Sequence, residues 1–115
     1  MLPGFFRAAG IDVVAEWRRF QAACPDQGAD TLAALVGLAH WGAQEIPHAD
    51  RLAARGLFCR RIADWGVFYT LGGACNDLWE ITVLHVSRCD RTEFDAAGRE
   101  ALRRRALRWD QENAR

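Results

Sequence analysis

Three runs of β-branched and aromatic residues follow one another in the second half of the chain. They cover residues 56–62, 65–71 and 78–89. Ala63-Asp64 separates the first run from the second, and residues 72–77, rich in glycine and polar side chains, separate the second from the third. Runs of this kind between short turns are typical of adjacent antiparallel strands. The pattern therefore predicts a three-strand antiparallel meander.

The segment before the meander has helical periodicity. Its apolar positions share the spacing of one helical face: Val13, Trp17, Phe20 and Cys24. Glu16, Arg18 and Arg19 are expected to lie largely off this face. We expect the helix to begin with Asp12 as its N-cap and to end at Pro25, with a turn over residues 25–28.

A second helix is predicted from Asp30 or Thr31 to residues 41–43. Between Thr31 and Ala43 the sequence carries no Asp, Glu, Lys or Arg. A helix that is apolar on most sides is either buried on two sides or in contact with a partner. Two interpretations stay open: a helix packed between the sheet and the first helix, or a partner surface.

The two ends of the chain complete the predicted fold. Residues 5–8 form an apolar stub that we interpret as a short N-terminal strand, at the edge or in the middle of the sheet. A last helix is expected over residues 96–112, with apolar positions at Leu102, Ala106 and Trp109. Its other faces carry five arginines, which are Arg99, Arg103, Arg104, Arg105 and Arg108. Such a basic face is either solvated or bound to an anionic nucleic acid or protein.

These elements predict an α+β fold with a short N-terminal strand, a helical hairpin, a three-strand antiparallel meander and a C-terminal helix. A length of 115 residues fits one domain, residues 1–115. The formal net charge is zero and every basic residue is arginine, so a general attraction to nucleic acid is not expected.

No leader pattern or membrane-spanning apolar run is visible, so we expect a cytoplasmic protein that does not enter a membrane. Its four cysteines, Cys24, Cys59, Cys75 and Cys89, are then expected to stay reduced. They form no C-x-x-C pair, and we expect neither a metal site nor a cofactor. Cys24 and Cys59 are interpreted as small buried hydrophobic residues.

The order of elements and a set of short motifs resemble the RelE/ParE superfamily of toxins from bacterial type II toxin–antitoxin modules. The matching positions are an anchoring Leu52, a Gly-aromatic entry to the strand near Gly56, and then Arg61, Trp65, Val67, Tyr69 and Ser87-Arg88. The resemblance covers about residues 10 to 95. It implies a chain that inhibits growth until a cognate antitoxin neutralises it.

The resemblance leaves two activities open: ribosome-dependent mRNA cleavage as in RelE, or inhibition of DNA gyrase as in ParE. The nuclease branch needs several cations and an acid–base group at the scissile phosphate. Here Gly66 replaces an arginine common in that branch, Leu57 and Cys59 stand where basic residues are common, and the terminal tyrosine falls near Asp95 or is missing.

The remaining catalytic candidates for an endoribonuclease are His85, Arg61 and Arg88. Strand alternation places His85 on the face of Ile81 and Val83, where it is either a hydrogen-bonded core residue, an acid–base group or a metal ligand.

Because the cationic set is depleted, we favour a ParE-like protein target. The expected target-binding residues are Arg91, Arg99, Arg103, Arg104, Arg105 and Arg108. The alternatives are the RelE-like endoribonuclease, whose target is the ribosome with its mRNA, and a non-toxic binding or regulatory module on the same scaffold.

Overall fold

The structure, a computed structural model, describes residues 6–8, 10–42, 46–52, 56–75, 78–90 and 92–113. The elements in chain order are β1 (Phe6–Ala8), α1 (Ile11–Ala23), α2 (Pro25–Trp41), the 3-10 turn η2 (His48–Asp50), β2 (Phe58–Ile62), β3 (Trp65–Cys75), β4 (Leu78–Arg88) and α3 (Phe94–Asn113). The prediction of two N-terminal helices, a three-strand antiparallel meander and a C-terminal helix is confirmed.

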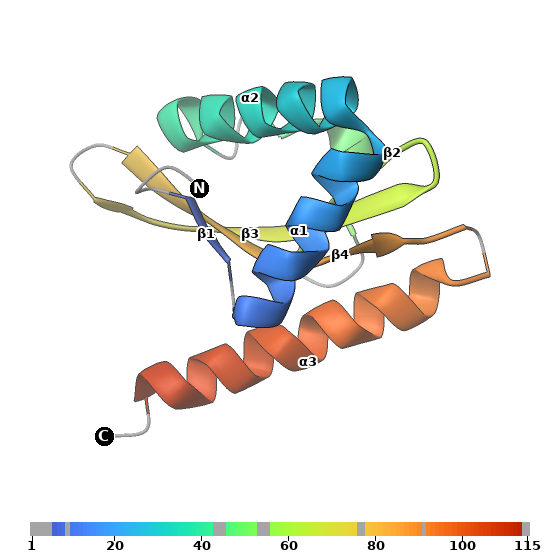
Figure 1. The fold of residues 1–115 in the computed structure, drawn as a ribbon. Helices are drawn as coiled ribbons and strands as arrows, with labels where there is room; N and C mark the ends of the chain where they lie inside the picture. The colour runs from blue at the N-terminus through green and yellow to red at the C-terminus, as the bar shows by residue number, and fades with distance from the viewer. Residues whose placement is uncertain are drawn as a thin grey trace.

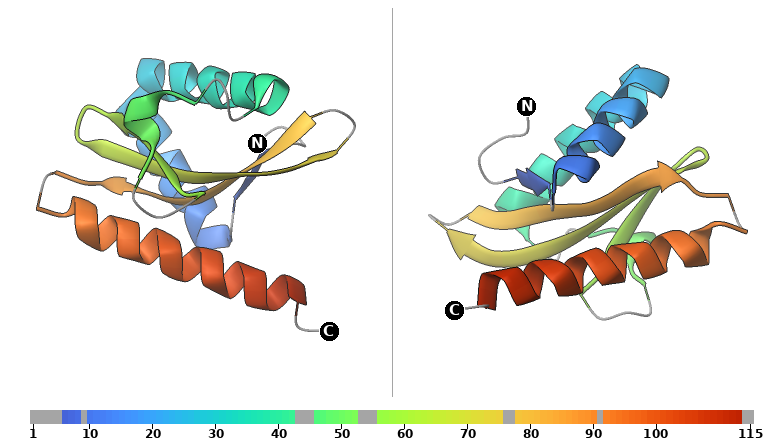
Figure 2. Two further views of the ribbon diagram at one scale, coloured as in Figure 1. Left: turned by 180° about the vertical axis from the view of Figure 1, so that it is seen from behind. Right: turned by 60° about the horizontal axis from the view of Figure 1, so that its bottom comes forward.

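One sheet with the strand order β1-β4-β3-β2 forms the middle layer. β2, β3 and β4 are antiparallel neighbours, and the three residues of β1 run parallel to β4 at one edge. The hairpin of α1 and α2 covers one face of the sheet, and α3 crosses the other face (Figures 1 and 2). The protein is therefore a helix–sheet–helix sandwich.

The sheet separates two hydrophobic cores of unequal size. The larger core lies under the helical hairpin and is made by Val13, Trp17, Phe20, Leu35, Leu38, Ala39, Ile46, Trp65, Val67, Tyr69, Ile81, Val83 and Val86. The smaller core lies under α3 and is made by Leu57, Cys59, Phe68, Leu84, Cys89, Ala97 and Ala101. α3 contributes Ala97 and Ala101 to this core, and its Phe94 and Leu102 pack against it while only partly buried.

The boundary between the first two helices differs from the prediction. Pro25 begins α2 instead of ending α1 in a turn, because a proline at the first helical position removes only an amide that has no helical partner. Cys24 is the single residue between the helices. Gly28 lies against Gln21, with only 3.3 Å from its ideal Cβ position to Gln21 Cα, so the helices cross closely.

Asp12 is not the N-cap of α1. The N-cap is Gly10, which has no side chain to cap the helix, and Asp12 lies in the first turn. A carboxylate there still interacts favourably with the positive end of the helix dipole.

α2 packs on the sheet by one face only. Leu35, Leu38 and Ala39 are buried on β4 and α1, whereas Ala33 on the opposite face is exposed and Trp41 is 71% exposed. The interpretation of a helix packed between the sheet and the first helix accounts for the buried face.

A β-bulge in β4 changes the predicted face of His85. Phe68 pairs with His85, but the next residue, Tyr69, pairs with Val83, so Leu84 is an extra residue without its own partner on β3. A bulge lets two consecutive residues lie on one side of a strand. His85 therefore leaves the face of Val83 and lies against Phe68 under α3, with ring centroids 6.0 Å apart.

The hairpin turns lie close to where the sequence places them. Ala63 in the first turn adopts a left-handed backbone conformation, φ 52°. The second turn is shorter than predicted, because β3 continues to Cys75 and β4 begins at Leu78.

Among the described residues, no helix is long and apolar enough to cross a membrane.

Candidate functional site

Glu16 lies where the sheet has an unpaired edge. Among the described residues, β1 pairs with residues 81–83 of β4 alone, and the later part of β4 extends past the end of β1. α1 runs beside this part of β4, and the Val86 amide donates a hydrogen bond of 3.1 Å to Glu16 Oε1. A side-chain carboxylate thus satisfies a backbone donor beside which the described part of the chain places no further strand.

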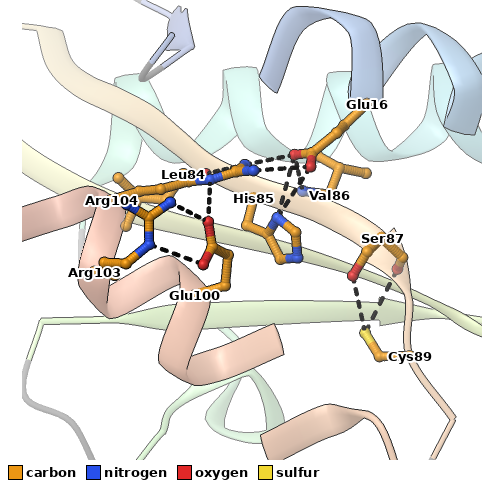
Figure 3. Close-up of polar contacts among 9 residues, drawn as sticks. All are labelled: Glu16, Leu84, His85, Val86, Ser87, Cys89, Glu100, Arg103 and Arg104. Atoms are coloured by element: carbon orange, nitrogen blue, oxygen red, sulfur yellow. Dashed lines mark hydrogen bonds and ion pairs between the residues drawn. The ribbon is translucent and has the colours of Figure 1, made fainter. Parts of the chain in front are cut away.

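Arg104 of α3 binds the same carboxylate from the opposite side of the sheet. Its Nη1 and Nη2 donate to the two oxygens of Glu16 at 2.7 and 3.1 Å, and Nη1 also donates to the Leu84 carbonyl at 3.1 Å (Figure 3). This bidentate pair joins α1, β4 and α3 at one point. We call Glu16, His85 and Arg104 the Glu16 cluster.

His85 completes this cluster. Its Nδ1 lies 3.2 Å from Glu16, and the His85 ring is buried. Burial raises the pKa of Glu16, but hydrogen bonds from His85, Arg104 and the Val86 amide outweigh it and hold the pKa at about 2. Glu16 is therefore a carboxylate at neutral pH and a weak base.

Glu100 extends the network along α3. It accepts hydrogen bonds from the Nε atoms of Arg103 and Arg104, each at 3.0 Å, and these bonds lower the pKa of Glu100 to about 2. Two of the five arginines predicted to bind a target on this helix are thus paired within it. Arg104 is deeply involved in the fold, whereas Arg103 remains exposed.

The three predicted catalytic residues occupy separate environments. The guanidinium of Arg61 lies 4.8 Å from the centre of the Phe94 ring, on the α3 side of the sheet. Arg88 lies over the Trp65 ring at 5.6 Å and 3.8 Å from Asp64, on the hairpin side. His85 contacts Glu16 instead. The structure does not bring the guanidinium groups of Arg61 and Arg88 to the same face.

The predicted target-binding arginines divide between the two flanks of α3. Arg103, Arg104 and Arg108, with Leu107, line a hollow of about 280 Å³ against Gly10, Asp12 and Val13 at the start of α1. Arg99 and Arg105 line hollows on the other flank. Arg91 lies outside the described residues.

A second buried carboxylate lies on the hairpin side. Asp50 of η2 accepts a hydrogen bond of 3.0 Å from the Tyr69 hydroxyl and lies 3.7 Å from Arg60. Burial raises the pKa of Asp50, with the Tyr69 hydrogen bond and the Arg60 charge opposing it. Arg60 and its neighbour Arg61 lie on opposite faces of the sheet, with Asp50 beside Arg60 and the Phe94 ring beside Arg61.

Gly66 is close to two buried thiols. A Cβ on Gly66 would lie 2.5 Å from Cys89 Sγ and 3.4 Å from Cys59 Sγ. Burial raises the pKa of Cys59 to about 12 and also raises that of Cys89, so both act as small hydrophobic groups. An arginine at position 66 has no room here. The Cys75 side chain lies outside the described part of the chain.

Sequence reasoning missed Glu16 and the internal role of Arg104. Glu16 was placed off the buried face of α1, yet it is only 8% exposed. The available signal was its spacing, three residues after Val13 and four before Phe20, which puts a charge beside the apolar face. An acid there requires a buried partner, but the sequence does not identify Arg104 as that partner.

No family model, curated protein or solved structure matches this chain. Within the described ranges, no group of three or more His, Cys, Asp or Glu side chains is arranged to hold a metal ion.

Proposed function

We propose that this protein is a growth-inhibiting toxin of a type II toxin–antitoxin module that acts by binding a protein, with DNA gyrase as the first candidate. A cognate antitoxin would neutralise it. The observation that carries the binding mode is the separation of Arg61 from Arg88 on opposite sheet faces, since phosphodiester cleavage needs cations converging on one phosphate.

The arrangement of elements supports the scaffold part of the proposal. A helical hairpin on one face of a meander and a terminal helix after it match the order that motivated the RelE/ParE resemblance. Leu52, Trp65, Val67 and Tyr69 are partly or fully buried, which is consistent with motif positions that serve the fold.

The target contact is assigned to α3, with one refinement. The Arg104 side chain is 17% exposed and paired with Glu16, so its role is to attach α3 to the rest of the fold. Arg103 and Arg108 on the α1 flank, with the half-exposed Leu107 between them, form the contact surface. Arginine and a large apolar residue together are typical of protein interfaces.

The test is growth after induced expression, with the DNA damage response and transcript integrity measured in the same culture. Wild type is expected to arrest growth, induce the damage response and leave transcripts intact. Replacing Arg103 and Arg108 with Ser should abolish the arrest without unfolding the protein. The matched control replaces Arg18 and Arg19, two exposed arginines of α1, with Ser. Equal toxicity of both variants would refute the assignment.

An endoribonuclease is the second candidate, because Glu16, His85 and Arg104 bring a carboxylate, an imidazole and a guanidinium into contact. An imidazole can act as acid or base and a guanidinium can stabilise charge at an RNA phosphate, with the carboxylate orienting both. Against this, all three are internally paired and little exposed.

Arrest with cleaved transcripts would favour the endoribonuclease. His85→Gln should then abolish cleavage while circular dichroism shows an intact fold. If soluble, folded protein causes no arrest at all, the non-toxic binding module becomes the leading function.

A further inference from the structure

A continuous groove follows the flank of α3 that faces away from α1. One hollow of about 300 Å³ is lined by Leu52, Leu57, Phe94, Asp95, Gly98, Arg99 and Leu102. The next, of about 510 Å³, is lined by Gly56, Thr70, Leu71, Gly72, Leu102, Arg105 and Ala106. The two hollows share Leu102 and run from the start of α3 past its middle.

The bottom of this groove lies at the margin of the smaller core, where apolar side chains are only partly covered. Leu52, Phe94 and Leu102 pack against that core yet are only partly buried. An apolar side chain placed in the groove would bury these three further and extend the core. Apolar anchors in pockets are the usual source of affinity for a bound segment.

The walls of the groove carry charge of mostly one sign. Arg99 and Arg105 of α3 line it, and Asp95, at the start of the helix, is the one acidic residue among the described residues that line it. Arg99 is exposed. A ligand with carboxylates beside these arginines and an uncharged end near Asp95 matches this distribution.

The opposite flank is different. There Arg103 is paired with Glu100 and Arg104 with Glu16, and Asp12 lines the same hollow. The groove that contains Leu102 instead has the exposed Arg99 beside an apolar floor, and this combination suits an acidic, amphipathic ligand.

We infer that this groove binds an acidic, amphipathic peptide segment of another protein, with apolar anchors over Leu102 and carboxylates beside Arg99 and Arg105. The inference rests on the proposed function in identifying that protein as the antitoxin. Binding would then occupy the flank of α3 opposite the one assigned to the target.

The experiment selects random short peptides on phage against the immobilised full chain, then measures the affinity of the enriched peptides, made synthetically with a fluorescent label. Enriched sequences should combine Asp or Glu with Leu, Ile or Phe. The double variant Arg99→Glu with Arg105→Glu should weaken their binding about tenfold, because two favourable rim charges become repulsive.

The same selection on the double variant should enrich basic peptides, a reversal that a merely structural role of the arginines would not cause. The matched control, Arg18→Glu with Arg19→Glu, reverses two exposed charges on α1 and should leave affinity unchanged. Enrichment of peptides that bind both variants equally, or no enrichment of acidic peptides, would overturn the inference.

The two proposals fail separately. Absence of growth arrest with charge-dependent peptide binding intact would refute the toxin function and leave the groove as a binding site. Growth arrest without such peptide binding would refute the groove alone.

Discussion

Glu16 and Asp50 are carboxylates buried to nearly the same extent, at 8% and 7% exposed, yet their pKa values move in opposite directions. Glu16 lies at the β4 edge and its pKa falls to about 2, whereas the pKa of Asp50 on the hairpin side rises. Burial favours the protonated form of both. The comparison shows that the hydrogen-bond donors around a carboxylate, more than its depth, decide the direction of its pKa shift.

The two environments differ in donors. Glu16 receives a bidentate guanidinium, an amide and a contact from His85. Asp50 accepts a hydrogen bond from the Tyr69 hydroxyl, and the Arg60 guanidinium lies 3.7 Å away. Charge-assisted bidentate bonds are roughly twice as strong as neutral ones, so only Glu16 is fully compensated.

The largest effect is expected from Arg104→Ala, which leaves the Glu16 charge buried without its main partner. The free energy of unfolding should fall by about 3–5 kcal/mol, measured by urea denaturation. Arg103→Ala, on the exposed neighbouring residue, is the control and should leave the free energy of unfolding almost unchanged. Similar losses in both variants would mean that Arg104 does not hold α3 to the sheet.

A smaller effect on the free energy of unfolding is expected when the pH is lowered. Since the folded pKa of Glu16 lies below its ordinary value of 4.5, its contribution to stability is complete above about pH 4.5 and lost as the pH falls toward 2. Glu16→Gln should flatten the dependence of unfolding free energy on pH in this window.

Glu100 also has a pKa of about 2, so Glu100→Gln is measured in parallel. Because Glu100 is more exposed, its substitution should flatten the curve less. A steeper curve for Glu16→Gln than for wild type would contradict the assigned direction.

The smallest effect is expected at Asp50. Its raised pKa means that stability is highest while Asp50 is protonated and is lost as the pH rises through the folded pKa, the reverse of Glu16. Tyr69→Phe removes the Asp50 hydrogen bond and should lower the free energy of unfolding at neutral pH by about 1 kcal/mol, measured by urea denaturation. A loss matching that of Arg104→Ala would remove the distinction between the two sites.

Local patterns were sufficient for most secondary structure. The stripe of Val13, Trp17 and Phe20 identified α1 and its buried side, and the apolar runs around Ala63-Asp64 identified the meander. Where neighbours on the chain did not decide the outcome, prediction failed: Pro25 suits the start of a helix as well as its end.

The sequence by itself determined the elements and their order, because periodicity and turn residues act over a few positions. Only the tertiary structure decided the site. The Leu84 bulge moved His85 to the other face. Because β1 ends before this part of β4, the Val86 amide donates its hydrogen bond to Glu16. Arg104, 88 positions from Glu16 along the chain, became its partner. Such pairings depend on how the sheet and helices pack, which no local pattern records.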